Sequence, residues 1–216
     1  MKKLGYMLLP ILAITLMLGG NAFAQGDASY FFVTYYSNAN TTQAPDGTLR
    51  LVYDGDLATA EVEGIPNSDI WAAIYVFDDS EELQDCCSCI ITPDGLLSES
   101  VNKQLVNPAL TLTGRAEINR GVIKVVSNST NDPTNLVPAA GIRGFMTHIQ
   151  ATSTTVGATK PWPSVGKAPF YVTETQLSDS NLVAAEQASL QESCSLAITL
   201  GSGFGICTCT PEDHDF

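Results

Sequence analysis

Six cysteines are the residues with the clearest chemical potential in this 216-residue chain, and they fall into two groups. One group is the run Cys86-Cys87-Ser88-Cys89, and the other comprises Cys194, Cys207 and Cys209. Cysteines in an oxidising compartment form stable disulfides. With three cysteines in each group, the sequence predicts three disulfides that join the middle of the chain to its C-terminal part.

Strand geometry favours two neighbouring links between the groups. Alternate residues of a β-strand point to one face, so Cys87 and Cys89 would project together, as would Cys207 and Cys209. Two such pairs on adjacent strands could face each other and bridge twice. Adjacent cysteines rarely bridge each other, because a disulfide needs Cα atoms about 4.4–6.8 Å apart in a specific orientation. The individual partners stay open, since six cysteines allow many connectivities.

Two other uses of these sulfur atoms remain as alternatives. Four of the six cysteines could bind a metal as thiolates, although zinc ribbons use C-x₂-C pairs whereas the close pairs here are C-x-C. A catalytic dithiol would usually show C-x-x-C at the start of a helix. Both comparisons favour structural disulfides over a metal site or a redox centre.

Catalytic motifs are scarce in the sequence. His148 alternates with apolar residues in an expected strand, and His214 lies in the acidic tail. There is no H-E-x-x-H motif and no G-x-S-x-G elbow, and the glycine-rich stretch 201–205 lacks the lysine of a phosphate-binding loop. We therefore expect no catalytic residues and no cofactor.

Several side chains could bind a partner or an ion. Trp162 lies between two prolines on an expected loop and is the best candidate for an exposed contact, whereas Trp71 lies in an apolar run and is expected in the core. Two N-glycosylation patterns begin at Asn40 and Asn128. Acidic clusters could hold Ca²⁺, but none matches an EF-hand loop, so we interpret them as turn residues and leave metal binding open. These clusters are Asp54 with Asp56, Asp78-Asp79 with Glu81-Glu82, and Asp213 with Asp215.

Charge and the N-terminal segment indicate where the protein acts. The chain has 10 Lys+Arg against 23 Asp+Glu and a formal net charge of −13, which argues against nucleic acid and anionic membranes as partners. Residues 1–24 show two lysines, an apolar run and the small-residue site Ala22-Phe23-Ala24, which is typical of a cleaved signal peptide. No later segment is long and apolar enough to span a membrane. We expect a single domain over 25–216 that is secreted, periplasmic or at the cell surface.

Hydrophobic patterning predicts many short strands and one helix. The helix is expected over 181–194, capped by Ser178 or Ser180, with Val183, Gln187, Leu190, Cys194 and Ile198 on its inward face. Strands are expected over 30–36, 49–53, 57–62, 70–77, 89–92, 110–113, 121–127, 145–150, 170–175 and 206–210. The predicted fold class is mainly β: a single-domain, disulfide-linked β-sandwich or barrel-like fold with one C-terminal α-helix.

Three segments together resemble a group of uncharacterised secreted bacterial proteins. They are CCSCIITPDGL (86–96), GIRGFMTH (141–148) and CTC (207–209). The resemblance implies an exported, cysteine-bridged protein, and it carries no activity, substrate or cofactor.

We therefore expect a non-catalytic structural, adhesive or interaction protein of the cell exterior or envelope. One alternative is a carbohydrate-binding module that would use Trp162 or the tyrosines Tyr30, Tyr35 and Tyr36. A second is an envelope thiol redox or metal-binding protein. The expected partner is an extracellular protein or a glycan. A homo-oligomer or fibre, in which the N-terminal strand completes a neighbour's sheet, is a further alternative.

Overall fold

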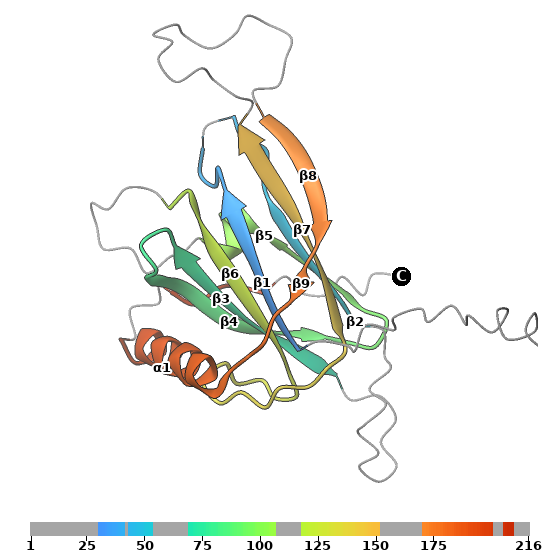
Figure 1. The fold of residues 1–216 in the computed structure, drawn as a ribbon, viewed down its shortest axis with the longest axis vertical. Helices are drawn as coiled ribbons and strands as arrows, with labels where there is room; N and C mark the ends of the chain where they lie inside the picture. The colour runs from blue at the N-terminus through green and yellow to red at the C-terminus, as the bar shows by residue number, and fades with distance from the viewer. Residues whose placement is uncertain are drawn as a thin grey trace, which may run out of the picture.

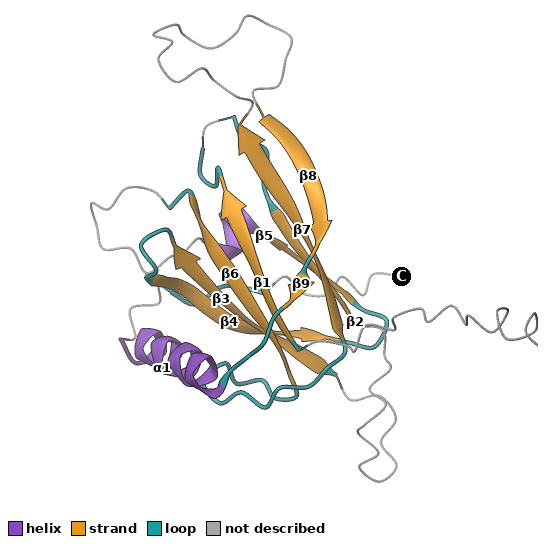
Figure 2. Cartoon of the chain, viewed as in Figure 1, coloured by secondary structure: helices purple, strands orange, loops and turns teal. Residues whose placement is uncertain are grey.

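The computed structural model describes residues 30–41, 43–53, 69–106, 118–151, 170–200 and 205–209. These residues form two antiparallel β-sheets that pack face to face, with one long helix against the outer face of one sheet (Figures 1 and 2). The described strands do not close into a barrel, and the predicted mainly-β, sandwich-like fold with a C-terminal helix is confirmed.

The larger sheet, sheet A, has five strands and the smaller one, sheet B, has four. Sheet A has the order β4 (Leu83–Ile91), β3 (Ile70–Asp78), β6 (Arg120–Asn128), β1 (Phe31–Ser37) and β9 (Ser178–Asp179). Sheet B has the order β5 (Leu96–Ser100), β2 (Thr48–Tyr53), β7 (Ile142–Ala151) and β8 (Phe170–Gln176). The helices are α1 (Ala184–Leu200) and the single wide turn η1 (Val101–Leu105).

The central strand β3 shows how the layers are held together. Ile70, Ile74 and Val76 point into the core between the sheets, while Tyr75 packs beneath α1 on the outer face. Each of these side chains is fully buried, which confirms the prediction of a strand that is covered on both sides. Sheet A therefore has two apolar faces, and it needs both sheet B and the helix to cover them.

Strand β4 differs from its prediction in a way that matters for the cysteines. The sequence places a strand over 89–92, with Cys86 and Cys87 at its start, but β4 runs over Leu83–Ile91 and holds both cysteines in its middle. The polar residues Gln84 and Asp85 concealed the start of the strand, although both are buried. Strand β5 was not predicted, and the predicted strands 57–62 and 110–113 lie outside the described residues.

The helix begins later and runs further than its predicted span of 181–194. Ser178 belongs to β9, so neither predicted serine cap is used, and the amide of Gln187 donates to the carbonyl of Val183 at the helix start. Leu190 and Cys194 are buried as predicted, but Val183 is 50% and Ile198 43% exposed. A narrow stripe of the helix packs on the sheet, and the rest of its apolar surface faces outward.

Candidate functional site

Three disulfides join the two cysteine groups, as the sequence predicts. Cys86 pairs with Cys194, Cys87 with Cys207, and Cys89 with Cys209. The paired Cα atoms are 5.9, 5.3 and 5.5 Å apart, which is the normal range for a disulfide. The structure thus supplies the connectivity that the sequence left open, including the double bridge between the two C-x-C pairs.

The alternation of β4 sends these disulfides to both faces of sheet A. Cys86 lies in the apolar cluster beneath α1, whereas Cys87 and Cys89 belong to the core between the sheets. The segment 205–209 runs parallel to β4, because the amide of Cys86 donates to the carbonyl of Gly205 and the amide of Cys207 donates to that of Cys86. The C-terminal segment therefore covers the outer edge of β4, and the disulfides fasten it there.

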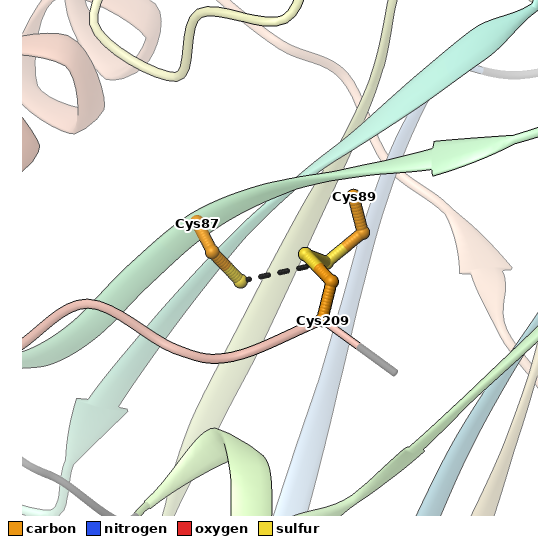
Figure 3. A group of neighbouring side chains, drawn as sticks. All are labelled: Cys87, Cys89 and Cys209. Atoms are coloured by element: carbon orange, nitrogen blue, oxygen red, sulfur yellow. Dashed lines mark hydrogen bonds between the residues drawn. A yellow bond between two sulfur atoms is a disulfide. The ribbon is translucent and has the colours of Figure 1, made fainter. Parts of the chain in front are cut away.

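The two inner disulfides form a compact group of sulfur atoms, and Figure 3 shows Cys87 beside the disulfide of Cys89 and Cys209. The Sγ atoms of Cys87 and Cys89 are 3.7 Å apart, and the Sγ atom of Cys209 lies within 4.8 Å of both. No described cysteine is free. In this oxidised form the sulfur atoms offer neither a thiolate ligand nor a nucleophile.

Asp85 is an unusual group next to this sulfur cluster. Its side chain is fully buried in β4, and among the described residues neither carboxylate oxygen has a partner at the distance and angle of a hydrogen bond. Burial raises the pKa of Asp85 from 3.8 to about 8, and the backbone amide of Cys86 opposes only part of this effect. The carboxyl group is therefore held mainly in its neutral form at neutral pH.

A second candidate site lies where β1, β7 and β8 meet. The register pairs His148 with Thr173 and Gln150 with Tyr171, and paired residues of an antiparallel sheet project to the same face. Tyr35 of β1 stacks on His148, with ring centroids 4.1 Å apart and an angle of 21° between the rings. We call Tyr35, His148, Gln150, Tyr171 and Thr175 the tyrosine face.

Hydrogen bonds connect the members of the tyrosine face. The hydroxyl of Tyr171 donates to Oε1 of Gln150 over 2.8 Å, and Nε2 of Gln150 donates to the hydroxyl of Tyr35 over 3.1 Å. Nε2 of His148 lies 2.8 Å from Oγ1 of Thr175. Tyr35 and Tyr171 nevertheless remain 46% and 48% exposed. The network therefore fixes two aromatic rings at the surface of the protein.

The imidazole of His148 is buried and packs against the ring of Tyr35. Burial lowers the pKa of His148, and the backbone of Tyr35 counteracts this only in part, so the ring is held in its neutral form. A neutral imidazole beside a threonine hydroxyl has the spacing of a base and a nucleophile. However, Nδ1 has no hydrogen-bond partner among the described residues, so no carboxylate orients the ring as in a catalytic triad.

Strand β8 continues this site along the edge of sheet B. All its residues after Phe170 are exposed, so the strand meets solvent on both faces. The amide of Leu177 donates to the carbonyl of Gly144 in register with the β7–β8 pairing. Because bonded pairs alternate along an antiparallel ladder, the backbone groups of Val172, Glu174 and Gln176 point away from β7. The Glu174 carboxylate is paired with Arg50 at 2.9 Å.

The structure gives three different outcomes for the other residues that the sequence analysis named. Trp162, His214 and the acidic pairs at 54–56 and 213–215 lie outside the described residues. Asp78 caps its own turn, since its carboxylate accepts hydrogen bonds from the amides of Ser80 and Glu82. Trp71 is only partly buried, on the outer face of β3.

The glycosylation pattern at Asn128 is contradicted by the structure. Asn128 is fully buried, and its Nδ2 atom donates to the carbonyl of Thr130 over 2.8 Å. A glycan on that nitrogen would break this contact and would need space that the fold does not provide. Asn40 is exposed, but its Nδ2 atom donates to the carbonyl of Ile118 over 3.0 Å.

Four contributors to the two sites were missed by the sequence analysis: Gln150, Tyr171, Thr175 and Asp85. Gln150 and Tyr171 are 21 residues apart, and the register of β7 with β8 brings them together. The signal for Asp85 was present, because it is a charged residue directly before a buried cysteine run. It was overlooked because the strand was expected to begin later.

No family model, curated protein or solved structure matches this chain. Among the described residues, no helix is long and apolar enough to cross a membrane. The disulfide-linked sandwich and its two candidate sites are therefore the basis for the functional argument.

We predict that the double variant Cys86→Ser/Cys194→Ser loses about 3 kcal/mol of unfolding free energy, because Cys87–Cys207 still closes most of the chain between these residues and the lost disulfide closes a further loop of only about 15 residues. Guanidinium denaturation followed by circular dichroism measures the effect. Ile198→Ser, on the exposed side of the same helix, is the control and should change the stability by less than about 0.5 kcal/mol. Equal stability of the double variant and the control would contradict the prediction.

We also predict that the stability depends on the ionisation of Asp85. Between the unfolded pKa of 3.8 and the folded pKa of about 8, the folded protein keeps a proton that the unfolded chain has lost. The unfolding free energy should therefore be greatest below pH 4 and fall as the pH rises, by up to about 1.4 kcal/mol per pH unit.

The variant Asp85→Asn tests this dependence, because it removes the ionisation and nearly preserves the volume. In this variant, denaturation midpoints measured from pH 4 to 9 should lose their fall between pH 4 and pH 8. In the matched control Asp94→Asn, which alters an exposed turn residue, they should retain it. Identical pH profiles for the two variants would refute a role for Asp85.

Proposed function

We propose that this protein is an exported, non-catalytic interaction module that contacts an extracellular partner through its tyrosine face. The observation that supports this most directly is the exposure of Tyr35 and Tyr171, 46% and 48%, within one hydrogen-bonded network. Exposed tyrosines that are already fixed in position lose little conformational entropy on binding, and they offer both apolar area and a hydroxyl.

Export is part of this proposal. The signal-like segment 1–24 supports it, as do three disulfides that would persist in an oxidising compartment. The cross-links restrict the unfolded chain, and this favours resistance to proteolysis outside the cell. A structural or adhesive role fits a fold that holds its contact residues on strands instead of loops.

The chemistry of the tyrosine face favours a neutral glycan as a second, more specific candidate partner. His148 is held neutral, and the remaining members carry hydroxyl and amide groups. Aromatic rings pack on the apolar faces of sugar rings, while amide and hydroxyl groups bond their hydroxyls. The −13 net charge of the chain argues against strongly anionic polysaccharides.

We predict that Tyr35→Ala/Tyr171→Ala weakens binding to neutral polysaccharides by at least about tenfold, since two ring contacts would be lost. A glycan array followed by calorimetry on the best ligand measures this. Tyr30→Ala is the matched control, because Tyr30 is 38% exposed and lies outside the network. Absence of binding to any glycan, or equal loss in the control, would contradict the glycan candidate.

The non-catalytic part of the proposal has its own test. A panel of hydrolase substrates should show no turnover that depends on His148. Activity abolished in His148→Ala but retained in Tyr35→Ala would overturn the non-catalytic assignment. Such a result would leave export and the fold unaffected.

A further inference from the structure

We propose that the thiol form of this protein binds one thiophilic metal ion, such as Zn²⁺, through Cys87, Cys89, Cys207 and Cys209. These four cysteines form the two inner disulfides, and three of their sulfur atoms lie within 4.8 Å of one another. The fourth, Cys207, is bonded to Cys87. This metal site is independent of the tyrosine face and of the binding function proposed for that face.

The spacing of the sulfur atoms fits a tetrahedral site after a small movement. Zinc–sulfur bonds of about 2.3 Å place neighbouring sulfur atoms in a tetrahedron about 3.7–3.8 Å apart. Cys87 and Cys89 already have this separation, at 3.7 Å, although no covalent bond joins them. After reduction, the two sulfur atoms of each former disulfide would move apart by less than about 2 Å. Cys207 lies outside the group of three within 4.8 Å, so its side chain must also turn towards Cys89 and Cys209.

The backbone holds Cys87 and Cys89 in place and anchors the segment of Cys207 beside them. β4 positions Cys87 and Cys89 through its ladder with β3, where Cys87 faces Ile74 and Cys89 faces Ala72. The segment that carries Cys207 is held by two backbone hydrogen bonds, one to the amide and one to the carbonyl of Cys86. The two C-x-C pairs can therefore stay opposite each other when the disulfides are open.

Burial of the cluster favours thiolate ligation by a metal over free thiols. Cys87, Cys89 and Cys207 are 5%, 1% and 6% exposed, and the surrounding core is apolar. Isolated thiolates would be costly there, and a bound Zn²⁺ offsets two of the four negative charges. The C-x-C spacing excludes a zinc ribbon, but it matches a site in which both ligands of each pair project from one strand face.

The third disulfide, Cys86–Cys194, lies on the other face of β4 from this site, because side chains alternate along the strand. Cys86 points to the opposite face of β4, where it bonds Cys194 beneath α1. Only the four inner sulfur atoms share one face, so one ion per chain is the expected stoichiometry. Cys86–Cys194 can keep the helix in place while the inner pair changes state.

The chemical step balances with a dithiol as the reductant. Two dithiol molecules each donate two electrons and two protons, reducing the two inner disulfides to four thiols while becoming disulfides themselves. Zinc binding then releases the thiol protons as the sulfur atoms become ligands. Metal-bound and disulfide forms are mutually exclusive, so the bound ion protects these cysteines from oxidation.

Two double variants with the same number of thiols test the proposal. Cys86→Ser/Cys194→Ser keeps the four inner cysteines, whereas Cys89→Ser/Cys209→Ser keeps four that are divided between the two faces of β4. Both full-length variants are reduced with excess dithiol, freed of reductant without oxygen and titrated with Zn²⁺ under a competing chelator. Native mass spectrometry counts the bound ions, and circular dichroism reports the fold.

We expect one Zn²⁺ per chain in the first variant, with an affinity on the order of 100-fold or more above that of the second. Recovery of strand structure on zinc addition would also support the site if the reduced chain unfolds. Equal affinities in the two variants would overturn the proposal, and so would a reduced first variant that neither binds zinc nor refolds with it.

Discussion

The covalent attachment of β4 on both of its faces is the constraint on which the rest of the structure depends. Side chains alternate along a strand, so consecutive cysteines at 86 and 87 reach opposite layers. One link fixes α1 to the outside of sheet A, and the other two fix the C-terminal segment within the sandwich.

The two sides of the sandwich are consequently different in character. At β4 the C-terminal segment occupies the strand edge at Cys86, so this part of the edge is not free to pair with another chain. At β8 the strand is exposed on both faces, and three residues turn their backbone groups outward. The proposed contact surface lies on this second side, on β1, β7 and β8, whereas the disulfides lie at β4, on the opposite edge of sheet A from β1 and β9. Rigidity and recognition are thus located on separate edges of one fold.

Most strands and the double cysteine bridge could be predicted, because both depend on the alternation of side chains between the two faces of one strand. Alternation alone indicated that Cys87 and Cys89 share a face, and the structure confirms that Cys207 and Cys209 meet them. The tyrosine face could not be predicted in the same way, since Tyr35 and His148 are 113 positions apart and meet only through the packing of two sheets. The prediction that Val183 and Ile198 face inward was wrong, because both are exposed. Helical spacing shows which residues share a face of the helix, but it does not show how much of that face the sheet covers.

Asp85 shows what the cross-links allow the core to contain. A pKa raised from 3.8 to about 8 corresponds to roughly 5–6 kcal/mol between the neutral and ionised carboxyl, and this penalty appears only when the unfolded chain ionises. One disulfide of this loop length contributes a similar amount, about 4–5 kcal/mol, and it acts on the unfolded chain at every pH. The three loops overlap, so the second and third links each contribute less than the first, but together the links still exceed the cost of one buried acid. The cross-linked sandwich can therefore keep a buried carboxyl group beside its disulfides at neutral pH.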